Sequence, residues 1–453
     1  MGGMRKRLTA LLAGAAILAA LFTGCAPQES ETILEPVPGD MVVGVMQSLY
    51  GSGGSRRLIR DYTDIAGVNA EIVEFVSDRD MIDAARRGEI DLALGNDLVN
   101  LILAHEGNLT DLEPVLGKRL GTGEYYDNVI EAGRVEEKLL IAIPHFQIDE
   151  SSEVILPTGL LAEGDPGTME GMTALFSEAD GMWLSDEVIV PCPLIGPAID
   201  WDEGTVDMTK LLPAYGAMVR AVDWSRVTGG PVAFEDQEGS GYSCVPLPIT
   251  DGAGFAISTV SGVIPRNAAH PGAALAFVDW IFSEKGQNLI CVGNGDNDYP
   301  TGCPVLKSAA KIWEGNWLSD NSTGIEKMEG YFAQADRLLP LSVTLKNSMI
   351  GLTIIYRTGK TGWARWKENI LTNSMSTEDE AEKAYPHAYE ILVRTAERMD
   401  EEEPEGWNDE GMKKAFYEEG AGEGWALLWE RFLSDYFTDL GYPLRAASAG
   451  DAG

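Results

Sequence analysis

The sequence predicts an α/β fold built around a parallel sheet. Three apolar runs with β-type composition, at residues 41–45, 70–75 and 90–94, are separated by two segments with helical periodicity. Strands that alternate with helices in this way form parallel sheets with right-handed crossovers. The chain has 453 residues, 45% of them hydrophobic, so it can bury a large core.

The N-terminus is typical of a lipoprotein signal. Three basic residues at 5–7 precede an apolar stretch at 8–22, which is shorter than the roughly 20 residues of a membrane-spanning helix. The following LFTGC at residues 21–25 resembles the bacterial lipobox, whose cysteine receives the lipid. We therefore expect residues 1–24 to be a lipoprotein signal peptide and Cys25 to be the lipidation site. The alternative is an ordinary secretory signal with an incidental cysteine.

Residues 25–40 have the composition of a tether. Three prolines, several acidic residues and little apolar periodicity predict an extended, solvated linker. It would hold the folded body away from a lipid surface, so we expect the protein outside the cell's cytoplasm and anchored to the cell membrane by its N-terminal lipid.

The body begins with the first strand, at 41–45. A Gly/Ser loop is expected at 47–55 (QSLYGSGGS), followed by a helix at 56–65. The apolar face of that helix comprises Leu58, Ile59, Tyr62 and Ile65.

The second strand and second helix are predicted at 70–75 and 78–87. The inward face of the helix comprises Met81, Ile82 and Ala85. The third strand, at 90–94, runs into Gly95-Asn96-Asp97.

Polar residues follow the first and third strands at the edge where ligands bind in open parallel sheets. Ser48 and Tyr50 come after the first strand, and Asn96 and Asp97 come after the third. We expect these four residues to face one crevice and to bind ligand. For Asn96 and Asp97, capping of the next helix is the alternative.

The charge of the chain restricts its partners. The net charge is -37 and the pI is about 4.3. A surface this acidic repels phosphate backbones and anionic headgroups, so we expect no nucleic-acid partner and no direct adhesion to anionic lipid.

Four cysteines remain once Cys25 is assigned to lipid. An even number in an exported chain permits two disulfides, with three possible connectivities. We favour Cys291–Cys303, because the intervening VGNGDNDYPTG is rich in turn residues, which leaves Cys192–Cys244 as the second pair. Buried free thiols are the alternative. With no CxxC and only four histidines, no metal site is expected.

Several motifs occur in a characteristic order over residues 40–310. They are DLALGND at 91–97, NLTDLEP at 108–114, KLLIAIP at 138–144, AIDWDEG from Ala198, LPITDGAGFAISTVSGVIP at 247–265 and HPGAALAFVDWIFSEKGQNLI at 270–290. Together they resemble the extracellular solute-binding proteins of sugar-type ABC importers, the maltose-binding-like group (family 1). One departure is Met169, which follows Thr168 where that group usually has tryptophan.

The resemblance implies a two-lobed periplasmic-binding-protein-like fold (type II), each lobe a mainly parallel sheet flanked by helices, with a helix-rich C-terminal part. The implied N-terminal lobe comprises residues 41–143 plus 250–298. The implied C-terminal lobe comprises 144–249 plus 299–445, and 446–453 form a flexible tail.

The resemblance also adds candidate ligand-binding residues. His145, Phe146 and Gln147 follow the first crossing between lobes, and Tyr299 lies near the second. Gly252 and Gly254 would let backbone approach a ligand, with a simple turn as the alternative. Trp183 and Trp224 are possible stacking platforms for sugar rings, with core packing as the alternative. For His145, a hydrogen-bonded hinge residue is the alternative.

The function implied is capture of a small-molecule solute, a mono- or oligosaccharide, in a cleft between the lobes by a monomeric protein. The solute would then pass to an ABC permease in the membrane, and no cofactor is implied. A ligand-binding sensor or adaptor lipoprotein is one alternative, and a secreted carbohydrate-active enzyme is another. The sequence contains no HExxH, GxSxG or P-loop motif.

Overall fold

The structure is a computed structural model of the whole chain. The chain divides into two units, Met1–Glu35 and Pro36–Gly453. The first unit, which contains the predicted signal and Cys25, lies outside the described residues. In the described part of the chain, no helix combines the length and the apolar character needed to cross a bilayer. The described residues are 40–46, 52–94, 97–148, 153–161, 169–178, 199–200, 203–207, 242–246, 248–250, 252–259, 261–292, 303–317, 325, 337–340, 386–405, 407 and 423–447.

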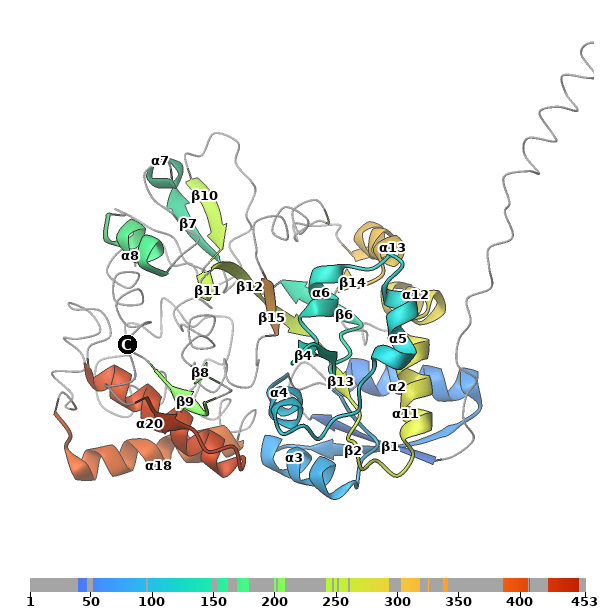
Figure 1. Cartoon of the computed structure of the whole chain (residues 1–453), viewed down its shortest axis with the longest axis horizontal. Coiled ribbons are helices and arrows are strands. Elements are labelled where there is room, and N and C mark those ends of the chain that lie inside the picture. The colour runs from blue at the N-terminus through green and yellow to red at the C-terminus, as the bar shows by residue number, and fades with distance from the viewer. Residues whose placement is uncertain are drawn as a thin grey trace, which may run out of the picture. The chain divides into compact units, whose positions relative to one another are not determined.

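The first sheet has four strands in the order β13-β3-β1-β2 (Figure 1). Its strands are β1 (Asp40–Met46), β2 (Asn69–Phe75), β3 (Leu92–Leu94) and β13 (Gly262–Val263). Strand β1 pairs in parallel with both β2 and β3, whereas β13 is antiparallel to β3. The predicted α/β organisation with a parallel sheet is confirmed for this region.

Helices cover both faces of this sheet. They are α2 (Ser52–Ala66), α3 (Asp78–Arg87), α4 (Asp97–His105) and α11 (Pro271–Ile281). A Cβ on Gly44 of β1 would lie 3.4 Å from Met81 of α3, so Gly44 faces α3. Successive strand residues face opposite sides, and the neighbouring Val43 and Val45 are also buried, so the second face is covered as well. On α2 and α11, which both contact β1, Tyr62 packs against Phe277 with ring centroids 5.0 Å apart.

The predicted helix faces are largely correct. The expected inward residues of α3 are fully buried, and Ala273, Ala274, Phe277 and Ile281 of α11 are buried as well. On α2, Leu58, Ile59 and Tyr62 are buried, but Ile65 is 45% exposed, because it lies in the last turn of the helix.

Helix α2 also begins earlier than predicted. It starts at Ser52, so the last four residues of the expected Gly/Ser loop, 52–55, are helical. The first four N–H groups of a helix have no intrahelical acceptor, and glycine and serine are therefore tolerated there.

Six further elements belong to this part of the structure: α5 (Glu113–Leu120), α6 (Asp127–Glu131), β4 (Arg134–Val135), β5 (Lys138–Leu139), α12 (Glu284–Val292) and α13 (Lys307–Trp317). Strands β4 and β5 form a hairpin. Lys138 and Leu139, the first residues of the motif at 138–144, belong to this hairpin, and Ala142 further along the motif bridges Gly262.

The chain then crosses to a second, five-stranded sheet. It contains β6 (His145–Ile148), β11 (Pro248–Thr250), β12 (Gly252–Thr259), β14 (Cys303–Pro304) and β15 (Arg337–Pro340). Strand β6 is antiparallel to both β12 and β14, and only β12 and β15 are parallel. The prediction of a second, mainly parallel sheet is therefore wrong for these strands. The chain runs away from the first sheet along β6 and back towards it along β12, so these two strands run in opposite directions.

The remaining described elements form small groups. They are β7 (Glu153–Pro157), α7 (Thr158–Leu161), α8 (Met169–Glu178), β8 (Ile199–Asp200), β9 (Thr205–Val206), β10 (Tyr242–Pro246), α18 (Pro386–Glu402), α20 (Glu423–Asp439) and β16 (Arg445–Ala446). Strands β7 and β10 pair in antiparallel fashion, and α18 lies along α20 (Figure 1). Strand β16 pairs with β9 and ends one residue into the predicted tail at 446–453.

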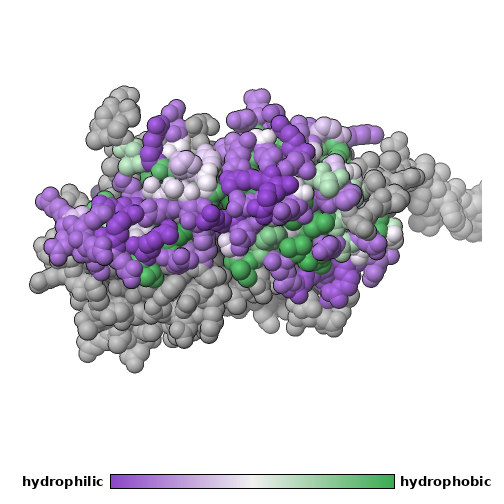
Figure 2. Space-filling view, turned by 90° about the horizontal axis from the view of Figure 1, so that it is seen from below, coloured by the Kyte–Doolittle hydropathy of each residue, from purple (hydrophilic) through white to green (hydrophobic). Residues whose placement is uncertain are grey.

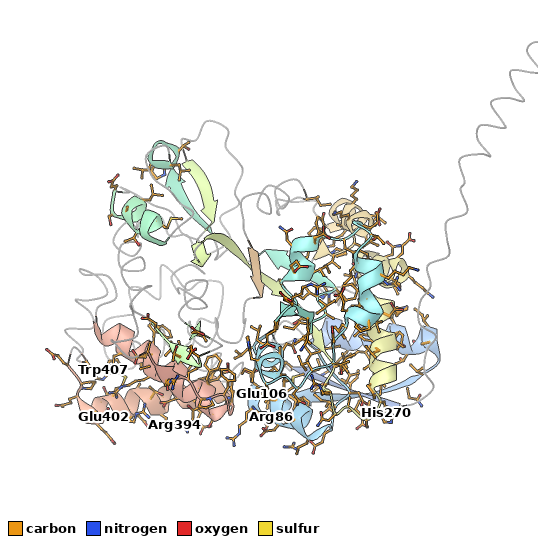
Figure 3. All side chains as sticks on the ribbon, viewed as in Figure 1. Arg86, Glu106, His270, Arg394, Glu402 and Trp407 are labelled. Carbon is orange, nitrogen blue, oxygen red and sulfur yellow. The ribbon has the colours of Figure 1, made fainter. Side chains whose placement is uncertain are left out.

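Polar contacts join α20 to α3. The hydroxyl of Tyr436 donates to the buried carboxylate of Asp78. Arg86 donates to the carbonyl of Leu440 at 3.1 Å and also pairs with Glu106, whose side chain lies beside it in Figure 3. Helix α20 is therefore hydrogen-bonded to α3, although the two helices were predicted to belong to different lobes.

The side chain of Gln287 holds the crossing segments together. Its Nε2 donates to the carbonyls of Pro144 and Ile281 at 3.0 and 2.9 Å, and its Oε1 accepts from the N–H of Leu306 at 3.0 Å. The residue before it, Gly286, has no room for a side chain, because a Cβ there would lie 2.3 Å from a backbone oxygen of Trp280.

Replacing Gln287 with leucine should destabilise the protein by about 3–5 kcal/mol, because three buried backbone groups would each lose a partner. Urea unfolding followed by circular dichroism measures the change. The matched control is Asn288→Leu, a partly exposed position on the same helix, which should change stability far less. Equal losses in the two variants would contradict this role of Gln287.

Candidate functional site

The carboxyl ends of β1 and β3 lie side by side. Val45 is in register with Leu94, and each strand ends at or just after that pair. The segments that follow the two strands therefore start at the same edge of the sheet, as the sequence predicted. Ligands bind at this edge in sheets of this type.

The segment by which the chain leaves the first sheet and the segment by which it returns lie side by side at the end of β3. Gly262 is in register with Leu94 at the end of β3, and its N–H and carbonyl exchange two 2.8 Å hydrogen bonds with Ala142. Beyond this bridge, Phe146 of β6 pairs with Thr259 of β12. The end of β3 is thus bordered by both passages between the first sheet and the second.

Most of the predicted ligand-binding side chains lie outside the described residues. These are Ser48, Tyr50, Asn96, Trp183, Trp224 and Tyr299, together with the side chains of Asp97 and Gln147. The backbone of Asp97 is the first residue of α4. The ligand-binding roles of these residues stay predictions.

Gly252 and Gly254 are strand residues. Both lie in β12, where Gly252 pairs with Thr250 and Gly254 with Arg337. Their role in approaching a ligand and the turn alternative both stay predictions.

His145 and Phe146 are buried at the start of β6. Phe146 is fully buried and packs edge-on against Tyr126, with ring centroids 5.8 Å apart. His145 is 3% exposed, and within the described structure its Nε2 has no hydrogen-bond partner. Burial lowers the pKa of His145 to about 4, because an imidazolium would lose its hydration there. At neutral pH the ring is therefore uncharged.

A polar pair not predicted from the sequence lies beside the end of β3. Asn100, in the first turns of α4, donates from Nδ2 to the hydroxyl of Ser261 at 2.8 Å, and both residues are at most 1% exposed. Among the described residues, the Oδ1 of Asn100 has no partner. A buried polar atom without a partner costs about 1–3 kcal/mol, so native proteins contain few of them.

The sequence did contain a signal for Asn100. It is the one polar residue between Leu98 and Ala104, a stretch that is otherwise entirely apolar. An uncharged polar residue inside such a run is costly to bury, and this cost should have marked it as a candidate.

The cysteine predictions stay open. Cys303 is buried in β14, with its Sγ 3.4 Å from the carbonyl oxygen of Pro304. The side chains of Cys244 and Cys291, and all of Cys192, lie outside the described residues. No cluster of three or more metal-ligating side chains occurs in the described ranges.

The surface seen in Figure 2 is mainly hydrophilic, with apolar residues gathered in one part of it. The two polar side chains described beside the end of β3, the carboxamide of Asn100 and the hydroxyl of Ser261, are uncharged. The chemistry available there is hydrogen bonding to a polar solute without charge neutralisation.

No protein-family model matches the chain, and no curated protein matches it in sequence. The function must therefore be argued from the arrangement at the end of β3.

Because His145 is buried, lowering the pH should reduce the stability of the protein. The unfolded chain binds a proton near pH 6.5, whereas the folded chain binds it only near pH 4, so stability falls as the pH drops through this window. Between pH 7 and 4.5, the wild type should lose roughly 2–3 kcal/mol more unfolding free energy than His145→Leu. Urea unfolding of both proteins at the two pH values measures this difference. Identical pH dependence would show that His145 is not buried in solution.

Proposed function

We propose that the chain is an extracytoplasmic substrate-binding lipoprotein of an ABC importer, and that it captures a carbohydrate. One observation carries the proposal: both crossings between the first and second sheets pass the carboxyl end of β3, beside the end of β1. A solute held there would contact the segments on which any movement of one sheet relative to the other depends. Binding would then shift the balance between open and closed forms.

The chemistry of the described residues supports an uncharged solute. Asn100, Ser261 and His145 offer hydrogen bonds without net charge, and sugars carry many hydroxyl groups that both donate and accept. An anionic solute would in addition be repelled by the net charge of -37.

The order of motifs in the sequence supports the fold assigned with this function. We propose the two-lobed type II arrangement, in which β6 and β12 are the passages between lobes. The contacts of α20 with α3 make the C-terminal part more closely associated with the first lobe than the sequence suggested.

A thermal-shift screen tests the carbohydrate assignment. The chain from residue 25, carrying Cys25→Ser, is heated with glucose, maltose, maltotriose and a panel of other sugars, amino acids and peptides. A sugar at a hundred times its Kd should stabilise the fold by about 2.7 kcal/mol and raise Tm accordingly. Chromatography should recover the sugar unchanged. A shift only with peptides or amino acids would reject the carbohydrate, and consumption of the sugar would favour an enzyme.

The lipoprotein assignment has its own test. Expressed in a bacterial host, the full chain should incorporate labelled palmitate and sediment with membranes. Cys25→Ser should abolish both, whereas Cys303→Ser, a change at a buried body cysteine, should leave labelling intact. Labelling that persists in Cys25→Ser would contradict the assignment.

A further inference from the structure

Asn100 lies where the proposed solute would bind. It belongs to the first turns of α4, the helix that follows β3, and its hydrogen-bond partner Ser261 precedes Gly262, which is in register with the last residue of β3. The carboxamide is therefore fixed to the edge of the sheet and to the returning crossing at once.

The contact with Ser261 uses one end of the carboxamide. Nδ2 donates to the serine hydroxyl at 2.8 Å, and Oδ1 has no partner among the described residues. A carboxamide oxygen is only an acceptor, so its missing partner must be a donor.

We propose that Asn100 is a solute-contacting residue, whose carboxamide oxygen accepts a hydrogen bond from a hydroxyl group of an uncharged sugar or polyol. This proposal rests on the proposed function and extends it by naming a contact and the chemical group that makes it. Ser261 is a positioning residue, because it holds the amide with the oxygen free.

The contact gives the site a chemical preference. Carboxylate and phosphate groups present acceptors, which cannot pair with Oδ1, so anions are disfavoured at this point. The oxygen is already closed off from bulk water, so a solute hydroxyl gains a hydrogen bond there that an analogue lacking the donor cannot make, and the analogue should bind more weakly.

The first arm of the test needs no ligand. Asn100→Leu is close in size and removes the unpaired oxygen together with the hydrogen bond to Ser261, so the gain and the loss should offset each other and the Tm of the empty protein should change little. The control is Thr395→Val, which removes a fully buried hydroxyl that donates to Asp435 at 2.7 Å and is also 2.8 Å from the carbonyl of Ile391. Its Tm should fall, because that hydroxyl has its partners within the protein. A fall in Asn100→Leu as large as in Thr395→Val overturns the proposal.

The second arm measures binding. Isothermal titration of glucose, maltose and maltotriose into the chain carrying Cys25→Ser should give a Kd for at least one sugar. Asn100→Leu should weaken that binding tenfold or more, whereas Thr395→Val should leave it within twofold. Unchanged affinity in Asn100→Leu overturns the contact.

The two arms separate failure of the inference from failure of the proposed function. If the wild type binds none of these sugars, the carbohydrate assignment is at fault, and the melting comparison still decides whether the oxygen is unpaired in the empty protein. If the wild type binds and Asn100→Leu binds equally well, the function stands and the contact is wrong.

Discussion

The close approach of Gly262 to the end of β3 is the constraint on which the described site depends. A Cβ at this position would lie 2.9 Å from Leu94, so a residue without a side chain lets β13 pair here undisturbed. The same backbone unit exchanges two hydrogen bonds with Ala142. One glycine therefore joins the outgoing and returning passages to the parallel sheet, and Ser261 and Asn100 are placed by it.

Some buried polar side chains of this region have hydrogen-bond partners for their polar atoms, and others do not. Gln287, equally buried, bonds to three backbone groups and fastens α12 to the crossing, so it has a structural role. Asn100 and His145 each keep a buried atom that lacks a partner in the described structure. Both are uncharged at neutral pH, and this sets the chemistry of the site apart from the strongly acidic chain around it.

The sequence predicted the first sheet well and the rest less well, for a physical reason. Residues 40–105 form a local α/β unit whose hydrophobic periodicity is set by neighbouring strands and helices, so α3 was predicted with its observed bounds. The second sheet pairs segments more than a hundred residues apart, such as β6 with β12, and periodicity carries no information on such partners. Asn100 was missed because a single residue leaves the apolar pattern of the helix intact, although one amide in such a run was itself a signal. Its contact with Ser261 and its unpaired oxygen could be found only once its neighbours in space were known.

The bonds between α3 and α20 restrict how two lobes of the proposed kind could move. Tyr436 and the carbonyl of Leu440 are bonded to α3, while β16, a few residues further on, pairs with β9 in the segment assigned to the second lobe. A relative rotation must either break these bonds or be absorbed between Leu440 and β16. Gly441, with a φ of 78°, lies in that interval, and a Cβ there would lie 3.0 Å from Arg86. Residues 440–444 are themselves held to α20, because the carbonyl of Leu444 accepts from the hydroxyl of Ser434 at 3.0 Å and Tyr442 packs against Phe437. Since α20 also contacts β9, a rotation of the proposed second lobe would have to carry α20 with it or break these contacts.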